Sequence, residues 1–387
     1  MTAAEGASLR VRTMVGASRW CSPDELPRIQ VAGGPSAAPW RIVEAVREQL
    51  GMDVVLLRIL EGDTVEVEEL RPHPTAPEPS GRFSGDGLWW QRPGWFERVL
   101  ALVDAQFGRL GITRVGRPQQ MRHWDVSAVL RVPTATHPVW FKAVPAVFGH
   151  EGAVAHWVSE AIPQHVPGVV AFGNAWLLTE EMAPERQSPA EHVLKAVARV
   201  QLASRGRTEE LLELGCPYRG LDTVPDAVAA LATRTDLLSP TELSGLSERL
   251  PGLKAVVATV ADLRVPETLV HGDIQLENAR WTGDHWKIID WTDGSVAHPF
   301  VELARPLMSA DDATRAEAER QFADTWSAVL PDQTVMGALR TAPVVGSAHQ
   351  LETYRLMVDS IGAHPELVRL LHLWTSRLVQ ALDSVEP

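Results

Sequence analysis

Residues 268 to 291 constrain the fold most, because they place a short β hairpin inside a C-terminal half that otherwise has the pattern of helices. Short segments at 279–281 and 286–289 flank a turn at 282–285, which is typical of a hairpin. A hairpin brings its two open ends together. The sequence therefore predicts that Asn278 and Asp290 are neighbours.

A short apolar strand at 268–270 leads into this hairpin through His271-Gly272-Asp273, where glycine permits a tight backbone bend. Because Asp273 lies five residues before Asn278, two carboxylates and one amide oxygen should converge at one edge. Hard oxygen ligands of this kind suit Mg²⁺, which proteins hold through one or two side chains plus substrate phosphates. The remaining carboxylate, Asp273, can accept a proton from an attacking hydroxyl. The alternative is a polar turn with a solvated aspartate and an asparagine cap. This alternative would explain any one of the three residues, but it explains the presence of all three at this spacing less well.

Lysine is rare in this chain, since 32 of the 36 basic residues are arginine. The four lysines are Lys142, Lys195, Lys254 and Lys287. All residues of Val139–Val144 except Lys142 are apolar, and strand alternation places Lys142 on one face with Trp140 and Val144. A buried ammonium is costly unless it is paired, so we expect an ion pair with Glu151, or with Glu160 on the same predicted helix. The alternative is an edge-strand lysine that prevents aggregation.

A strand lysine, a helix glutamate, the motif His271-Gly272-Asp273-x-x-x-x-Asn278 and a following Ile289-Asp290 form a pattern that resembles the aminoglycoside phosphotransferase and choline kinase family. The resemblance covers roughly residues 115–380. It implies an α+β, bilobal protein-kinase-like fold with a small β-rich N-lobe and a large helical C-lobe, here preceded by a small α/β N-terminal unit. It also implies transfer of the γ-phosphoryl group of ATP or GTP to a small molecule.

The resemblance assigns roles residue by residue. Lys142 would hold the α- and β-phosphates, with Glu151 orienting it. Asp273 would be the catalytic base, and Asn278 and Asp290 would bind Mg²⁺. The segment from Glu180 to Met182 resembles the hinge, whose backbone groups would bind the adenine.

This sequence departs from the family pattern in three places. No glycine-rich loop precedes the strand at 127–132, so backbone amides of the turn at 121–126 and the Ser127 hydroxyl would have to bind phosphate. Ser127 fits an ordinary strand residue equally well. Gln275-Leu276-Glu277 stands where members often have His-Pro-Gly, and Glu277 would either tune the metal or point to solvent. The first 110 residues exceed the minimal kinase fold, and they would shape the acceptor site or only stabilise the small lobe.

Three further residues are weaker candidates. Asp293 and Glu302 follow the proposed metal aspartate and would contact an amine or hydroxyl of the substrate. Glu302 fits a second role better, in which it fixes the catalytic loop. His271 similarly fits a hydrogen-bonded scaffold residue better than a proton carrier.

A Pro- and Gly-rich segment at 71–94 is the clearest linker in the chain. With the hinge, it predicts three parts: an α/β extension and linker at 1–94, a kinase-like N-lobe at 95–182 and a helical C-lobe at 183–387. Amphipathic helices are predicted at 39–50 and 95–110.

The net charge of −13, from 36 basic and 49 acidic residues, argues against nucleic-acid and membrane partners. Cys21 and Cys216 have no metal-binding or redox spacing. The N-terminus lacks the apolar region of a secretion signal, and no stretch approaches the ~20 apolar residues of a membrane helix. We therefore expect a cytoplasmic protein. The sequence does not indicate an oligomeric state.

The combined prediction is an ATP- or GTP-dependent, Mg²⁺-dependent O-phosphotransferase that acts on a hydroxyl of an antibiotic or sugar-like compound. Arginine usage and abundant alanine suggest a GC-rich bacterial genome, for which antibiotic resistance is plausible. The alternatives are a metabolic sugar or amino-sugar kinase, and a noncatalytic nucleotide-binding scaffold. A metal-dependent hydrolase built on His271, Asp273 and Asp290 would leave Lys142 unexplained.

Overall fold

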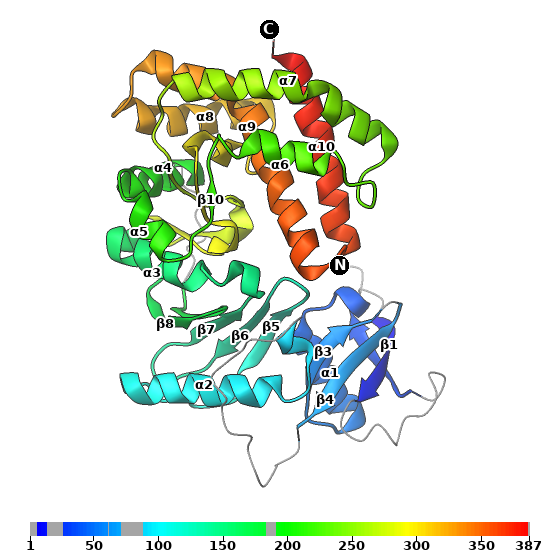
Figure 1. Cartoon of the computed structure of the whole chain (residues 1–387). Coiled ribbons are helices and arrows are strands. Elements are labelled where there is room, and N and C mark those ends of the chain that lie inside the picture. Colours follow the sequence, from blue (N-terminus) through cyan, green and yellow to red (C-terminus); the bar gives the residue numbers. More distant parts are fainter. Residues whose placement is uncertain (1–5, 14–25, 61, 71–87, 183–190, 386–387) are drawn as a thin grey trace. The chain divides into compact units, whose positions relative to one another are not determined.

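The computed structural model describes residues 6–13, 26–60, 62–70, 88–182 and 191–385. The chain divides into two units, of which the first comprises residues 1–146 and 170–181 and the second residues 147–169 and 182–387 (Figure 1). Both units contain helices and sheets, so the α+β class is confirmed. The three-part division with a boundary at residue 94 stays a prediction. Residues 71–87 of the predicted linker lie outside the described residues.

The described part of the first unit contains two sheets and two α-helices. Its elements are β1 (Gly6–Thr13), β2 (Arg28–Ala32), α1 (Pro39–Leu50), β3 (Val54–Ile59), β4 (Thr64–Glu69), α2 (Trp95–Leu110), β5 (Gln119–His123), β6 (Ala128–Val132), β7 (Val139–Ala143), β8 (Val169–Gly173) and β9 (Trp176–Glu180). One sheet has the order β2-β1-β4-β3, in which β1 and β4 are parallel. The other has the order β5-β6-β7-β9-β8 and is antiparallel from β5 to β9.

Both helices of this unit have the predicted bounds because their end signals are local. α1 begins at Pro39 and ends before Gly51, which adopts a φ of 68° that suits glycine. The turn between β8 and β9 differs from the prediction, since it uses Asn174 and Ala175 rather than Gly173 and Asn174. Gly173 ends β8, where a Cβ would lie 2.5 Å from the indole nitrogen of Trp176. Packing of this indole, not a turn, therefore explains the glycine.

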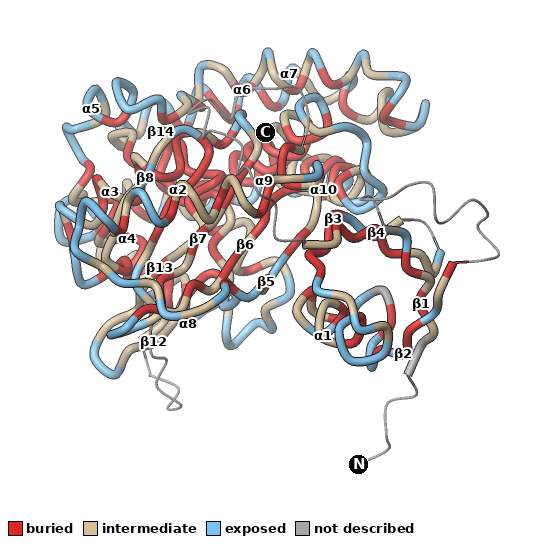
Figure 2. Tube along the Cα trace, turned by 90° about the horizontal axis from the view of Figure 1, so that it is seen from below, coloured by how far each residue is buried: buried red, intermediate tan, exposed pale blue. Residues whose placement is uncertain are grey.

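The strand β3 contributes to two hydrophobic cores because its side chains alternate between two faces. Val54 and Leu56 pack in the core beneath α1. Val55 and Leu57 pack with buried residues of α2, β6, β7 and β9, and Figure 2 shows the burial along β3, β6 and β7. The N-terminal sheet therefore shares a core with the five-stranded sheet, which supports the expectation that the N-terminal residues stabilise the small lobe.

Two buried side chains of β5 satisfy the backbone of β3, which is the edge strand of its sheet. Gln120 Oε1 accepts a hydrogen bond from the Leu56 N–H at 2.8 Å, and Gln120 Nε2 donates to the Leu56 carbonyl at 3.0 Å. His123 Nε2 donates to the Leu57 carbonyl at 2.6 Å. Burial lowers the pKa of His123 to about 4, so this imidazole is neutral at pH 7.

We expect Gln120→Ala to lower the free energy of unfolding by about 1–3 kcal/mol, because a buried backbone N–H and carbonyl would lose their partners. Urea denaturation of the full chain, followed by tryptophan fluorescence, measures the change. Gln119→Ala is the matched control, since Gln119 is exposed and its loss should cost less than about 0.5 kcal/mol. Equal stability of the two variants would show that the side-chain bridge does not stabilise the sheet edge.

The second unit is mostly helical. Its elements are α3 (Glu151–Ala161), α4 (Val193–Ser204), α5 (Thr208–Glu213), β10 (Tyr218–Arg219), α6 (Val224–Leu231), α7 (Pro240–Asp262), β11 (Thr268–Val270), β12 (Ala279–Trp281), β13 (Trp286–Ile288), β14 (Ser295–Ala297), α8 (Asp312–Ser327), α9 (Asp332–Ile361) and α10 (Pro365–Ser384). The predicted hairpin is β12–β13, and β11 pairs with β14 in a small sheet of order β10-β14-β11. None of the helices in the described ranges has the length and apolar character to cross a membrane.

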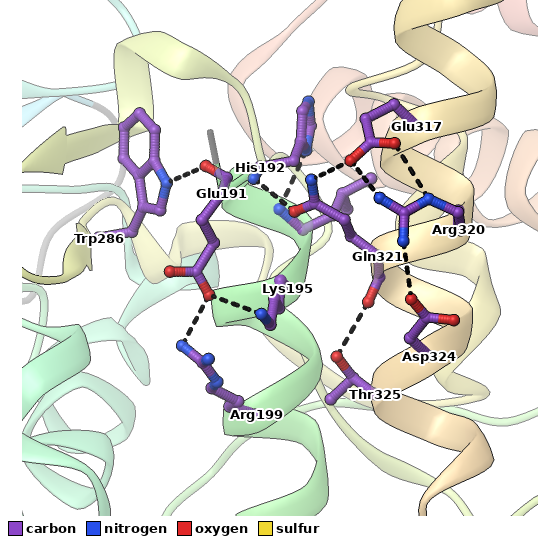
Figure 3. A network of polar contacts seen from close by, with 11 residues as sticks. Glu191, His192, Lys195, Arg199, Trp286, Glu317, Arg320, Gln321, Asp324 and Thr325 are labelled. Carbon is purple, nitrogen blue, oxygen red and sulfur yellow. Dashed lines mark hydrogen bonds and ion pairs between the residues drawn. The ribbon is translucent and has the colours of Figure 1, made fainter. Parts of the chain in front are cut away.

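A polar network fixes the hairpin to the helices α4 and α8 (Figure 3). Trp286 Nε1 on β13 donates to the Glu191 carbonyl at 2.8 Å, and the Glu191 carboxylate pairs with Arg199 of α4 at 2.8 Å. Gln321 of α8 accepts a hydrogen bond from the backbone N–H of His192 at 2.7 Å. The hairpin that bears the candidate site is thus bound at β13 to the segment just before α4, and side chains of α4 and α8 bind that segment in turn.

Candidate active site

Asn278 and Asp290 lie at the open end of the β12–β13 hairpin, so the prediction that they are neighbours is confirmed. Ala279 pairs with Ile288, and the Ile289 N–H donates to the Asn278 carbonyl at 2.9 Å. Asn278 ends a 3₁₀ turn and is 7% exposed, whereas Asp290 is half-buried. The hairpin register therefore brings an amide and a carboxylate together at the open end of the hairpin.

The backbone and one hydroxyl orient the carboxylate of Asp290. Asp290 has a φ of 70°, in the left-handed region that aspartate tolerates better than most residues. Thr292 Oγ1 donates a hydrogen bond to Asp290 Oδ1 at 2.7 Å. Thr292 is itself buried, so its hydroxyl holds this carboxylate from the protein interior.

Three side chains donate hydrogen bonds to the carboxylate of Asp273. Gln275 Nε2 lies 3.1 Å from both oxygens. Asn278 Nδ2 donates to Oδ2 at 3.1 Å and also to the Asp273 carbonyl at 2.8 Å. Arg305 Nε donates to Oδ1 at 2.7 Å. Sequence reasoning missed Gln275 and Arg305 as contacts of Asp273, because no local pattern marks either side chain as its partner.

The loop that bears Asp273 is fixed by Glu302, which is 1% exposed. The Glu302 carboxylate accepts hydrogen bonds from the backbone N–H groups of His271 at 2.7 Å and Gly272 at 3.1 Å. Gln201 Nε2 donates to it at 3.4 Å, and Gln350 Nε2 donates to the Gly272 carbonyl. These contacts fit the expectation that Glu302 fixes the catalytic loop, and they occupy its carboxylate. Burial raises the pKa of Glu302 to about 7.

Glycine is required at position 272. Its φ is 81°, and a Cβ there would lie 2.7 Å from the carbonyl oxygen of Asp293. Asp293 is 4% exposed and packs directly against this bend. Its contact with a substrate stays a prediction.

His271 has the bonds of a scaffold residue. Its Nε2 donates to the Ile289 carbonyl at 2.9 Å, and its Nδ1 accepts from the Asp273 N–H at 3.3 Å. Together these bonds define a neutral imidazole with its proton on Nε2. His271 therefore links the loop before Asp273 to the strand before Asp290.

Glu277 is exposed on the same loop. Of the two alternatives, its exposure supports the one in which it points to solvent.

Lys142 lies on β7, which is a central strand of the five-stranded sheet. The edge-strand alternative is therefore wrong, because β7 pairs with β6 on one side and with β9 on the other. Lys142 shares a face with Trp140, as predicted, but this face is only half-buried, while Val139 and Phe141 fill the buried face. The ammonium group thus avoids the apolar core. Its pairing with a glutamate stays a prediction.

The other predicted nucleotide-site residues lie on or beside three elements. Glu151 is the first residue of α3 in the second unit and is 1% exposed, whereas Glu160 is exposed near the other end of that helix. Ser127 directly precedes β6, and its Oγ accepts a hydrogen bond from Trp124 Nε1 at 2.9 Å. Glu180 ends β9, and the chain passes into the second unit at Met182. Their binding roles stay predictions.

A family model described as the phosphotransferase enzyme family, APH, matches residues 122–339, which is more than half of the chain. The chain belongs to this family. The resemblance to the aminoglycoside phosphotransferase and choline kinase family is confirmed. The protein is therefore a phosphotransferase, a kinase with an alcohol group as acceptor. Among curated proteins, none matches this phosphotransferase in sequence.

Solved structures share the fold of this phosphotransferase at low sequence identity. An ethanolamine kinase from Plasmodium vivax has a TM-score of 0.55 at 13% identity, over 84% of this chain and 97% of that one. The GDP complex of wild-type aminoglycoside 2'-phosphotransferase-IIIa has a TM-score of 0.51 at 12% identity, over 72% of this chain and 98% of that one. These similarities show a kinase-like fold.

We expect Glu302→Gln to change how the stability of this phosphotransferase depends on pH. The folded-state pKa of about 7 lies above the ordinary value of 4.5, so folding favours the protonated carboxyl. The contribution of Glu302 is then fully present below pH 4.5 and is lost as the pH rises through about 7. Between pH 5 and 7 the wild-type free energy of unfolding should fall, relative to Glu302→Gln, by at most about 1.4 kcal/mol per pH unit. Urea denaturation of both proteins at pH 5 and pH 7 measures this difference. The same change in the free energy of unfolding with pH in both proteins would contradict the prediction.

Proposed function

We propose that this phosphotransferase transfers the γ-phosphoryl group of ATP or GTP to a hydroxyl of a small molecule and requires Mg²⁺. The observation that carries the proposal is the position of the Asp273 carboxylate, which is hydrogen-bonded to Asn278 at the hairpin end where Asn278 and Asp290 meet. One group that can orient a hydroxyl thus lies beside two groups that can hold a metal. A bound GDP in one structure of similar fold supports a nucleotide as donor.

In the proposed reaction, the acceptor oxygen attacks the γ-phosphorus and the bond to the β-phosphate oxygen breaks, which releases the nucleoside diphosphate. Asp273 accepts the hydrogen bond of the hydroxyl and takes its proton. The transition state is loose, so the proton can leave late and orientation matters more than strong basicity. The three donors on the Asp273 carboxylate provide that orientation.

The donor set fits Mg²⁺. Within the described ranges, no three His, Cys, Asp or Glu side chains come together as metal ligands. Mg²⁺ does not need such a cluster, because proteins usually hold it through one or two side chains together with substrate phosphates. Asn278 turns its amide nitrogen to Asp273, and its oxygen is the atom that would bind the metal together with the Asp290 carboxylate. A bound Mg²⁺ would neutralise charge on the phosphates.

The resemblance to the family supplies the remaining nucleotide contacts of the proposal. Lys142 would hold the α- and β-phosphates, Ser127 would contribute a hydroxyl near them, and Glu151 would orient the lysine. The segment from Glu180 to Met182 would be the hinge. The proposal includes the division into an extension at 1–94, an N-lobe at 95–182 and a C-lobe at 183–387.

The acceptor is proposed to be an antibiotic or another sugar-like compound, with a metabolic sugar or amino sugar as the alternative. Structures of similar fold include an ethanolamine kinase and a GDP and kanamycin complex of APH(2")-IIIa, so the fold alone does not select the acceptor. A panel of aminoglycosides, amino sugars, sugars and ethanolamine with ATP or GTP, read by product mass, would identify it.

We expect Asp273→Asn to lower kcat with the identified acceptor by about 10²–10⁴-fold, since a positioned base contributes that much to proton transfer. Nucleotide binding, measured by calorimetry, should change little. Asp284→Asn on the exposed hairpin turn is the matched control and should keep wild-type kcat. Wild-type turnover in Asp273→Asn would contradict the assignment of the base. A noncatalytic scaffold would bind nucleotide and phosphorylate no member of the panel.

We expect Thr292→Val to raise the Mg²⁺ concentration needed for half-maximal activity by about 10–100-fold, because the carboxylate of Asp290 loses the hydroxyl that orients it. Thr282→Val is the matched control, since Thr282 donates to the His285 carbonyl at the closed end of the same hairpin. Magnesium titrations of the transfer rate compare the two variants. The same Mg²⁺ requirement in both would argue against Asp290 as a metal ligand.

A further inference from the structure

Arg305 contacts the proposed base from outside the catalytic loop. It lies two residues beyond the 3₁₀ turn Pro299–Leu303, and its side chain is 13% exposed. Its Nε donates to Asp273 Oδ1 at 2.7 Å, which is the shortest of the hydrogen bonds between side chains on this carboxylate. We infer that Arg305 is a positioning residue that holds Oδ1 and thereby presents Oδ2 to the acceptor hydroxyl. This inference rests on the proposed role of Asp273.

The donors on Asp273 are not equivalent. Gln275 and Asn278 belong to the same loop as Asp273, so they move with it. Arg305 is 32 residues further along the chain and fixes the carboxylate relative to the rest of the unit. A guanidinium is always charged at physiological pH, and its bond to a carboxylate is stronger than that of a neutral amide. Oδ2 receives its amide hydrogen bonds at 3.1 Å each, which are longer than the arginine bond to Oδ1, so it is the oxygen better placed to accept the hydrogen bond of the acceptor hydroxyl.

The segment that bears Arg305 is itself held from two helices. Arg315 of α8 donates to the Leu307 carbonyl at 2.8 Å, and Arg377 of α10 donates to the Met308 carbonyl at 3.0 Å. Arg305 Nη1 lies 3.7 Å from the Met308 sulfur. The guanidinium is thus placed before substrate arrives, and the carboxylate does not need to reorganise during the reaction.

The test compares Arg305→Met and Arg305→Lys with Arg377→Met, using the acceptor that the wild type phosphorylates. Arg377→Met loses a bond to the same segment but no contact with Asp273. We expect Arg305→Met to lower kcat by about 10–100-fold, since a small displacement of a reacting group costs that much. KM for the nucleotide should stay within about twofold, and Arg305→Lys should restore part of kcat. Arg377→Met should keep kcat within about twofold.

A double-mutant cycle separates this inference from the proposed function. If Arg305 acts through Asp273, Arg305→Met should lower kcat no further in the Asp273→Asn background. A full, additive loss there would overturn the inference and leave the base assignment intact. Wild-type turnover in Asp273→Asn would instead overturn the proposed function.

Wild-type kcat in Arg305→Met, or an equal loss in Arg377→Met, would also overturn the positioning role. If Arg305→Met does not fold, Arg305→Lys decides alone: a lower kcat at unchanged nucleotide KM supports the inference, and wild-type kcat overturns it.

Discussion

The site of this phosphotransferase depends first on the buried carboxylate of Glu302. Two consecutive backbone N–H groups, of His271 and Gly272, point into the protein interior and need an acceptor. Glu302 accepts both, and Gln350 donates to the carbonyl of the same glycine. These contacts stabilise the bend at Gly272, and the bend sets the direction in which Asp273 leaves the strand β11. Without them, two buried backbone N–H groups at the bend would lack acceptors.

The hairpin brings further polar groups to the residues that follow this bend. Its register returns Asp290 to Asn278, and Asn278 bonds both the carbonyl and the carboxylate of Asp273. His271 adds a further link, from the loop before Asp273 to the carbonyl of Ile289. Residues that are distant in sequence thus share one set of hydrogen bonds, and loops that are positioned by a rigid scaffold are where binding and catalytic groups commonly lie.

Local signals made the helices and the hairpin predictable. Side-chain partners that lie far apart in the sequence could not be predicted in this way. Proline and glycine mark both ends of α1, and alternating apolar residues mark β7. Arg305 and Gln350 contact the loop at 271–273 from 32 and 78 residues away, where no sequence period connects them to it. The shared core of the N-terminal sheet had a usable signal, because the continuous apolar run of β3 is typical of a strand that is buried on both faces.

The ion pair between Arg305 and Asp273 bears on which reaction this site suits. Arg305 Nε lies 2.7 Å from Asp273 Oδ1 and keeps the carboxylate aligned. A kinase with a loose transition state needs this alignment more than a strong base, because the acceptor's proton can leave after most of the phosphorus–oxygen bond has broken. The geometry therefore favours orientation of the acceptor hydroxyl, which is the main requirement of phosphoryl transfer.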